Sequence, residues 1–188
     1  MISRFILALL VYSNFTFSIT SLVGQDILEG VLNNPRIIPQ TKIEGAVITI
    51  TDGSQVTMKI ECNSLVIVDA NQNRSTPTIL EGKVKAIFFD ENQKPVSVLE
   101  SDFAEYIENY SLVAKNNIMV HNLETKDTLV FINESSEIEW NHFVEKIQSN
   151  DQFILKNKEG CTTGSSFQSN VDLTDMNISN PRGSNKCE

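Results

Sequence analysis

The sequence predicts an all-β domain made of a meandering antiparallel sheet, and three observations lead to this prediction. From Lys42 onward, apolar residues recur at every second position, which is the period of a half-buried strand. Turn residues interrupt the apolar runs at intervals of roughly 8–12 residues, and the chain holds 19 Asn, a residue type that favours turns. After Lys42, no window of about 11 residues has the apolar spacing of an amphipathic helix.

The first strands have the clearest pattern. Ile48 and Ile50 alternate with threonines, and Asp52-Gly53 then marks a tight hairpin turn. The partner strand covers residues 56–62, and a third run covers residues 65–69. We therefore expect the β domain to open with a hairpin.

The same pattern continues along the rest of the chain. The further apolar runs are residues 83–89, 95–99, 102–107, 112–114, 118–121, 129–132, 137–140, 143–147 and 153–155. A dozen or so short strands at this spacing are typical of one all-β domain. The length of 188 residues and the mass of 21.1 kDa suit one such domain with a terminal appendage.

Composition excludes several classes of function. The formal charge is −9, so a nucleic-acid partner, which needs a basic face, is not expected. The two histidines, His121 and His142, are too few for a three-histidine metal site, and no phosphate-loop, dinucleotide-binding or hydrolase motif occurs. Glu137 and Glu139 share one strand face, where solvated charges are far commoner than catalytic pairs. The sequence thus predicts a protein that is not an enzyme, with no cofactor and no metal.

The pattern of the N-terminus predicts an export signal. Residues 5–12 are all apolar, 13 of the 19 residues from 5 to 23 are apolar, and no acidic residue occurs before Asp26. This pattern fits a cleaved secretory signal and an uncleaved single transmembrane helix about equally. Pro35 and Pro39 then indicate an extended linker. We expect a signal or anchor at residues 1–24, a linker at 25–41, an exported β domain at 42–183 and a disordered tail at 184–188.

Three cysteines cannot all pair within one chain. Cys62 ends an alternating run and is expected to be a buried small apolar residue. Cys161 and Cys187 are able to pair in an oxidising compartment, which leaves both the disulfide and the reduced pair open.

Four segments of the sequence, in the same order, resemble the sequence pattern of a known family. They are TDGSQVTMKIECNSL (residues 51–65), GKVKAIFFDENQKPVSVLESDFAEY (82–106), AKNNIMVHNLETKDTLVFINESSEIEWNHFVEKIQSND (114–151) and GSSFQSNVDLTDMNISNPRG (164–183). The chain resembles the periplasmic lipopolysaccharide-export proteins of the LptC type, in their Bacteroidetes form, over some 70% of its length. The family pattern has Gly-Asn where this chain has Asn116-Asn117, and Asn adopts positive φ less freely than Gly.

The resemblance implies a fold, a location and partners. The fold would be a twisted, boat-shaped antiparallel β-jellyroll in the periplasm, preceded by an apolar helix that crosses the inner membrane once. The partners would be lipopolysaccharide, the permease subunits of the inner-membrane ABC exporter and a periplasmic β-jellyroll bridge protein. Lipid would lie in an apolar trough and pass from sheet to sheet by edge-to-edge docking.

Strand alternation within this family fold assigns the trough. The side chains expected to face inward, called the trough residues below, are Ile48, Ile50, Val56, Met58, Ile60, Val84, Ala86, Phe88, Leu129, Phe131, Trp140, Phe153 and Leu155. The residues expected at the docking edge are Gly164, Phe167 and Ile178, although structural support of the sheet end explains them equally well.

Charge and alternatives complete the prediction. Because the body after residue 24 is near −10, affinity for an anionic lipid would come from acyl burial at ~0.8 kcal/mol per CH₂. Lys83, Lys85, Lys115 and Lys126 are candidate cations at the rim, although isolated surface lysines more commonly serve solubility. A soluble LptA-like bridge protein, favoured if the signal is cleaved, and a secreted β-sandwich for binding or adhesion remain as alternatives.

Overall fold

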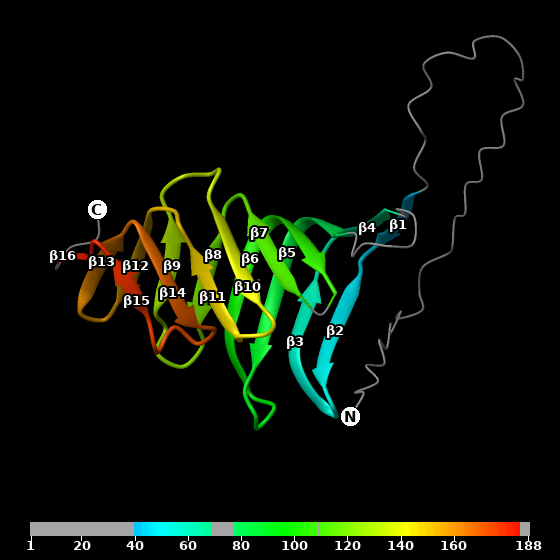
Figure 1. Cartoon of the computed structure of the whole chain (residues 1–188), viewed down its shortest axis with the longest axis horizontal. Coiled ribbons are helices and arrows are strands. Elements are labelled where there is room, and N and C mark those ends of the chain that lie inside the picture. The colour runs from blue at the N-terminus through cyan, green and yellow to red at the C-terminus, as the bar shows by residue number, and fades with distance from the viewer. Residues whose placement is uncertain (1–39, 69–76, 109, 185–188) are drawn as a thin grey trace, which may run out of the picture.

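The computed structural model describes residues 40–68, 77–108 and 110–184. Within these ranges the protein is one antiparallel sheet of sixteen strands without a helix, which confirms the all-β prediction (Figure 1). The strands are β1 (Gln40–Glu44), β2 (Val47–Asp52), β3 (Gln55–Glu61), β4 (Ser64–Val68), β5 (Thr78–Phe89), β6 (Pro95–Ile107), β7 (Ser111–Lys115), β8 (Met119–Asn122), β9 (Thr128–Phe131), β10 (Glu137–Asn141), β11 (Lys146–Ser149), β12 (Phe153–Asn157), β13 (Gly160–Gly164), β14 (Ser166–Asn170), β15 (Asn177–Ser179) and β16 (Arg182–Ser184).

The pairing divides the sheet into two layers that share their longest strands. Residues 78–81 of β5 pair with β4, whereas residues 85–88 pair with β3. Residues 103–107 of β6 pair with β7, whereas residues 97–100 pair with β8. The first layer therefore runs β1-β4-β5-β6-β7-β10-β11-β14-β15, and the second runs β2-β3-β5-β6-β8-β9-β12-β13-β16.

A line of short breaks, here named the crease, separates the two layers. Two strands that follow each other across such a break, such as β1 and β2 or β3 and β4, are the two halves of one long strand, whereas β5 and β6 cross the crease within a single strand. The breaks are at residues 45–46, 62–63, 82–83, 102, 116–118, 132–136, 150–152, 165 and 180–181. At the crease, φ is positive at Gly45, Gly82, Lys83, Asn116, Asn117 and Asn180. Because positive φ turns the chain out of the pleated plane, the sheet folds along this line. The Asn116-Asn117 pair thus makes the break despite lacking glycine.

Backbone hydrogen bonds continue the sheet across the crease. The N–H of Gly45 donates to the carbonyl of Asn63 at 2.8 Å, and the N–H of Asn63 donates to the carbonyl of Gly82 at 2.9 Å. A Cβ at Gly82 would stand 3.0 Å from the Asn63 amide nitrogen, so a glycine is needed there for both space and φ. The crease is therefore a bend within one hydrogen-bonded sheet and not a gap between two sheets.

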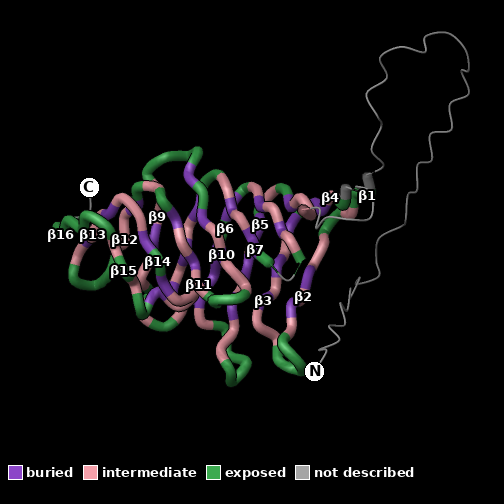
Figure 2. Tube along the Cα trace, viewed as in Figure 1, coloured by how far each residue is buried: buried purple, intermediate pink, exposed green. Residues whose placement is uncertain are grey.

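Alternation along each strand places apolar side chains between the layers (Figure 2). The buried core includes Met58, Leu80, Leu99, Leu112 and Ile147, which are all fully buried. The core extends from the β2–β3 end of the sheet to the β13–β14 end. The interior is thus one continuous apolar space filled by side chains.

Several boundaries differ from the prediction. Gln40 and Thr41, expected in the linker, lie in β1, and Ser184, expected in the tail, ends β16. The run at residues 143–147 is mostly a turn, because the Asn141 side chain accepts hydrogen bonds from the N–H groups of Phe143 and Val144. The predicted anchor, the rest of the linker and residues 185–188 lie outside the described residues. No helix long and apolar enough to cross a membrane occurs in the described ranges.

Candidate functional site

The trough residues line the inner face of the folded sheet. Ten of them are buried: Ile48, Ile50, Met58, Ile60, Val84, Ala86, Phe88, Leu129, Trp140 and Phe153. The other three, Val56, Phe131 and Leu155, are half-buried. Phe131 and Leu155 pack against the buried core. A β-bulge between Ile50 and Thr51 shifts the register where Val56 pairs, beside the turn of the first hairpin.

Aromatic rings from the two layers meet across this interior. Phe88 on β5 lies 6.0 Å from Trp140 on β10, measured between ring centroids. Phe167 on β14 lies 5.0 Å from Phe153 on β12, edge to face, and 6.3 Å from Phe131 on β9. Each pair joins one layer to the other, so the layers pack face to face. A ligand in this space would have to separate rings that now touch.

The docking-edge prediction is wrong for two of its three residues. Gly164 ends β13, which pairs with β12 and β16, and Phe167 lies on β14, which pairs with β11 and β15. Phe167 is also 4% exposed, so it belongs to the core. Ile178 alone stands on a strand, β15, that pairs on one side within the described residues. The segment is paired internally because each of its short strands continues the hairpin meander.

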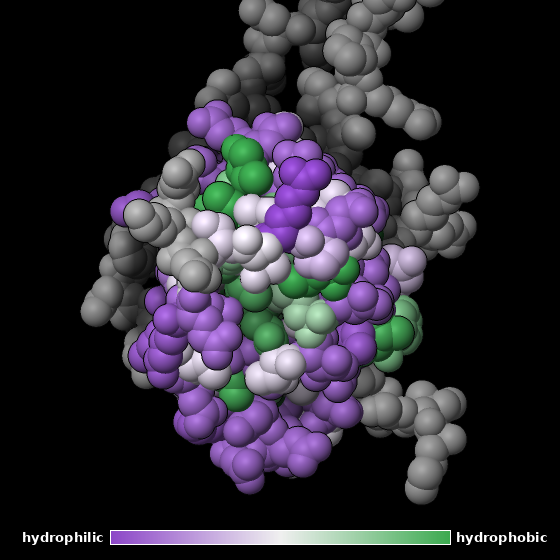
Figure 3. Space-filling view, turned by 90° about the vertical axis from the view of Figure 1, so that its left-hand side faces the viewer, coloured by the Kyte–Doolittle hydropathy of each residue, from purple (hydrophilic) through white to green (hydrophobic). Residues whose placement is uncertain are grey.

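Gly164 is required by close packing and not by an edge. A Cβ at this position would stand 2.6 Å from Ile178 Cγ2 and 2.7 Å from Phe153 Cε1. Figure 3 views the molecule from this end, where apolar side chains gather in the centre within a hydrophilic ring. The half-buried side chains of Leu155, Ile178 and Met176, which pack on the core, belong to the strands and loop nearby. Apolar side chains of the interior therefore come close to the surface at the β13–β16 end.

A loop of the first layer, residues 171–176, reaches the second layer; we name it the strap. Ser97 on β6 donates a hydrogen bond from Oγ to the carbonyl of Val171. The Asn122 amide on β8 donates to the carbonyl of Asp172. Leu173 is 7% exposed, joins the core cluster and has a φ of 61°. The strap closes the interior on the side away from the crease.

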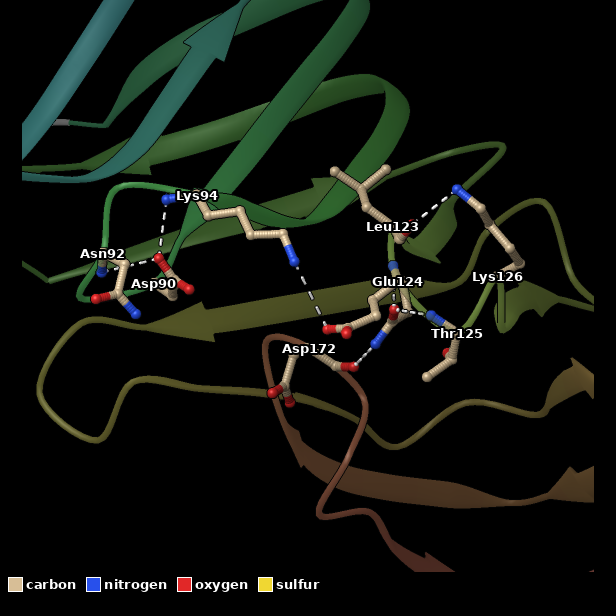
Figure 4. A network of polar contacts seen from close by, with 9 residues as sticks. Asp90, Asn92, Lys94, Leu123, Glu124, Thr125, Lys126 and Asp172 are labelled. Carbon is tan, nitrogen blue, oxygen red and sulfur yellow. Dashed lines mark hydrogen bonds and ion pairs between the residues drawn. The ribbon is translucent and has the colours of Figure 1, made fainter.

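Figure 4 shows the polar contacts on which the strap rests. The Asn122 Oδ1 accepts hydrogen bonds from the N–H groups of Glu124 and Thr125, both at 2.7 Å. Lys94, in the turn after β5, lies 3.9 Å from Glu124. One buried asparagine therefore fixes both its own turn and the strap.

The carboxylates and histidines considered at first have structural partners. Glu137 pairs with Lys115, and Glu139 accepts a hydrogen bond from Gln148 at 3.0 Å. The His121 ring contacts the Thr128 hydroxyl at 3.1 Å, and His142 stacks edge to face on Trp140. No group of three metal-ligating side chains occurs in residues 40–184 as far as they are described.

Lys115, a candidate rim cation, is bound by two carboxylates on the outer face of the first layer. Its Nζ lies 3.2 Å from oxygens of both Glu105 and Glu137. Burial opposes its charge, but the hydrogen bonds and charges of Glu137 and Glu105 outweigh burial and raise the pKa of Lys115. This lysine is therefore engaged within the sheet and does not serve an external anion.

The raised pKa of Lys115 predicts a pH dependence of stability. Below its ordinary pKa of 10.5, the amine is charged in the folded and unfolded states, so the stabilisation is fully present. As the pH rises through the higher folded pKa, the stabilisation is lost. As the pH rises from below 10.5 through the higher folded pKa, urea unfolding should show a loss of about 1 kcal/mol that Lys115→Gln lacks. Equal losses in both proteins would contradict this assignment.

The cysteines have different states. Cys161 on β13 is disulfide-bonded, while Cys62 keeps a free thiol, and burial raises the pKa of that thiol. Cys187, the partner considered from the sequence, lies outside the described residues.

Comparison with known proteins leaves the fold and the interior as the basis for function. No protein-family model matches the chain, and no curated protein matches it either. Sequence reasoning missed the strap, because Leu173 stands alone between polar residues and carries no periodic signal. It also missed the grouping of Lys126 with two lysines of the β12–β13 hairpin, which only the pairing of β9 with β12 brings together.

Proposed function

We propose that this protein is a non-enzymatic, LptC-type β-jellyroll component of lipopolysaccharide export, which holds lipid acyl chains between its two layers. The observation that carries the proposal is the continuous apolar interior of a sheet that is folded along one crease. In a closed sandwich, two separate sheets pack together and share no strand. Here the two layers share β5 and β6 and are joined at the crease, so the side opposite the crease is able to open. Acyl chains would enter on that side.

The arrangement of edges supports transfer from sheet to sheet. Within the described residues, β1 pairs only with β4, β2 only with β3, and β15 only with β14. The first two lie at one end of the molecule and β15 lies toward the other (Figure 1). Unpaired edges accept a further strand by β-augmentation. The β1–β2 end would face the inner-membrane exporter, and the β15 end would dock the periplasmic bridge protein.

The net charge supports a head group that stays outside the interior. The protein carries a formal charge of −9, so long-range attraction to an anionic lipid is absent. Each buried CH₂ contributes ~0.8 kcal/mol, and the buried side chains of both layers are mostly apolar, with a few serines among them such as Ser97 and Ser169. Binding by acyl chains with the head group in solvent therefore fits the charge and the interior together.

Site-specific photo-crosslinking in Gram-negative cells that produce the full chain tests the proposal. A benzophenone side chain at Phe131 or Phe88, both on the inner face, should capture lipopolysaccharide. The same group at Lys59 or Lys85 should not, because these side chains alternate to the outer face. Capture at all four positions, or at none, would overturn a one-sided lipid trough.

A sugar-binding surface is less well supported. Trp140 is 4% exposed, so the only tryptophan is not available for stacking. Tyr110 and Phe143 are exposed side by side, but their rings meet edge to face at 79°. This geometry does not form the flat platform that a sugar ring requires.

A further inference from the structure

The outer face of the second layer holds an open pocket that the trough does not include. Its volume is about 420 Å³, and it is lined by Met119, Lys126, Thr128, Val130, Lys156, Asn157 and Lys158. Met119 pairs with Val130, and Thr128 pairs with Lys156, in register across β8, β9 and β12. Leu129, between Thr128 and Val130, is fully buried in the interior, as is Phe153 on β12. The pocket is thus separated from the trough by the thickness of the sheet.

Charge is distributed unusually around this pocket. Ten lysines lie in the described residues, and five of them, Lys42, Lys59, Lys94, Lys115 and Lys146, form ion pairs. Of the five others, three line this one pocket: Lys126, Lys156 and Lys158. The acidic neighbours in the same turns, Asp127 and Glu159, form no ion pair with them among the described residues. An acidic protein therefore concentrates at one place three cations that form no ion pair within the part of the chain that the structure describes.

The backbone holds these cations in position. Lys126 has a φ of 68°, and its Nζ donates a hydrogen bond to the carbonyl of Leu123 at 2.7 Å (Figure 4). Lys158 stands in the β12–β13 turn, where the Asn157 side chain accepts hydrogen bonds from the N–H groups of Glu159 and Gly160. Lys156 pairs in register with Cys161 and Thr128. Two ordered turns and one strand thus present three ammonium groups around an apolar floor.

We infer that this pocket binds a small amphiphile with a phosphate head and a short apolar body. The phosphate oxygens would accept charge-assisted hydrogen bonds from the lysines, and the apolar body would lie on Met119 and Val130. The volume is within the range of small-molecule sites, ~300–1,000 Å³. The site goes beyond the proposed lipid transport and does not depend on it, since it lies on the opposite face of β9 and β12.

Calorimetric titration of the full chain tests the inference. The chain is kept in a nonionic detergent at a concentration that does not disturb the titration. Hexyl phosphate should bind, and it should bind at least about tenfold more tightly than inorganic phosphate or hexanol. The double variant Lys156→Gln/Lys158→Gln should weaken hexyl phosphate at least about tenfold. The matched variant Lys83→Gln/Lys85→Gln removes the same charge from β5 and should leave the affinity unchanged.

Two further results separate this site from the trough. Val130→Thr, which keeps the side-chain shape but adds a hydroxyl, should reduce the preference for hexyl phosphate over inorganic phosphate. Phe131→Leu, on the inner face, should leave hexyl phosphate binding unchanged whatever it does to lipopolysaccharide. Equal binding of inorganic and hexyl phosphate, or equal weakening by both lysine pairs, would overturn the inference. Loss of lipopolysaccharide crosslinking alone would contradict only the proposed transport function.

Discussion

The Phe167→Asp variant is expected not to fold. The position is 4% exposed and contacts the rings of Phe153 and Phe131, so a carboxylate there would be buried without a cation. Burying an unpaired charge, together with the loss of the ring, should cost about 4 kcal/mol or more. That loss is a large share of the ~5–15 kcal/mol that stabilises a typical domain. Circular dichroism and thermal unfolding of the purified chain measure the effect.

Two companion variants make this test specific. Phe167→Leu keeps the apolar contact and should cost only about 1 kcal/mol. Gly164→Ala should also be strongly destabilising, because its Cβ would stand 2.6 Å from Ile178 and 2.7 Å from Phe153. A folded Phe167→Asp chain that fails only to bind its partner would show that Phe167 is a docking residue after all.

The second large effect is expected at Asn122, which is 5% exposed. Asn122→Ala removes the acceptor for the N–H groups of Glu124 and Thr125 and the donor to Asp172. Leaving buried polar groups without partners should cost about 2–4 kcal/mol. Urea unfolding of the variant and the wild type measures this difference.

Asn122→Asp is the matched control for the strap. Its carboxylate still accepts hydrogen bonds from the turn, but it cannot donate to the Asp172 carbonyl. Because a buried carboxylate would then face that carbonyl oxygen, we expect a clear loss of stability, with faster amide hydrogen exchange confined to residues 171–176. If the proposed function is right, this variant should also take up lipid faster. If amide exchange rises equally in the strap and in the turn that contains Glu124 and Thr125, the donor and acceptor groups of Asn122 do not act independently on these two segments.

The sequence was sufficient for the all-β class and for most of the inner face. Ile48 and Met58 belong to strands with clear alternation, so a period of two assigned their side chains to one face, and the structure buries both. It also buries Phe88, although residues 86–89 are apolar on both faces. The strands after residue 160 carried no such signal. Residues 160–164 read GCTTG and residues 177–179 read NIS, where small and polar side chains hide the period.

The folding of the sheet could not be read from the sequence. Breaks at Gly45 and Gly82 resemble ordinary turns, and Lys83, with a φ of 51°, gives no sign of its conformation. Whether a break ends a strand or bends it depends on hydrogen bonds to the neighbouring strand, such as Asn63 to Gly82. These are non-local contacts. The two layers, the strap and the lysine pocket also depend on non-local strand pairing, so the sequence alone did not predict them.

The order of pairing also has a consequence for how the chain reaches its native state. Almost every long strand, counted with both of its halves, pairs with the long strand before it and the one after it in the sequence. The order of the long strands in the sheet therefore follows the order of the chain, from one end of the molecule to the other. The β5–β6 hairpin is the longest element and has a turn of only five residues, Asp90 to Lys94, closed by backbone hydrogen bonds. Its closure entropy is small, and it already contains both sides of the crease. Folding should therefore begin at this hairpin and spread outward in both directions, with β1 and β15 ordering last and opening first.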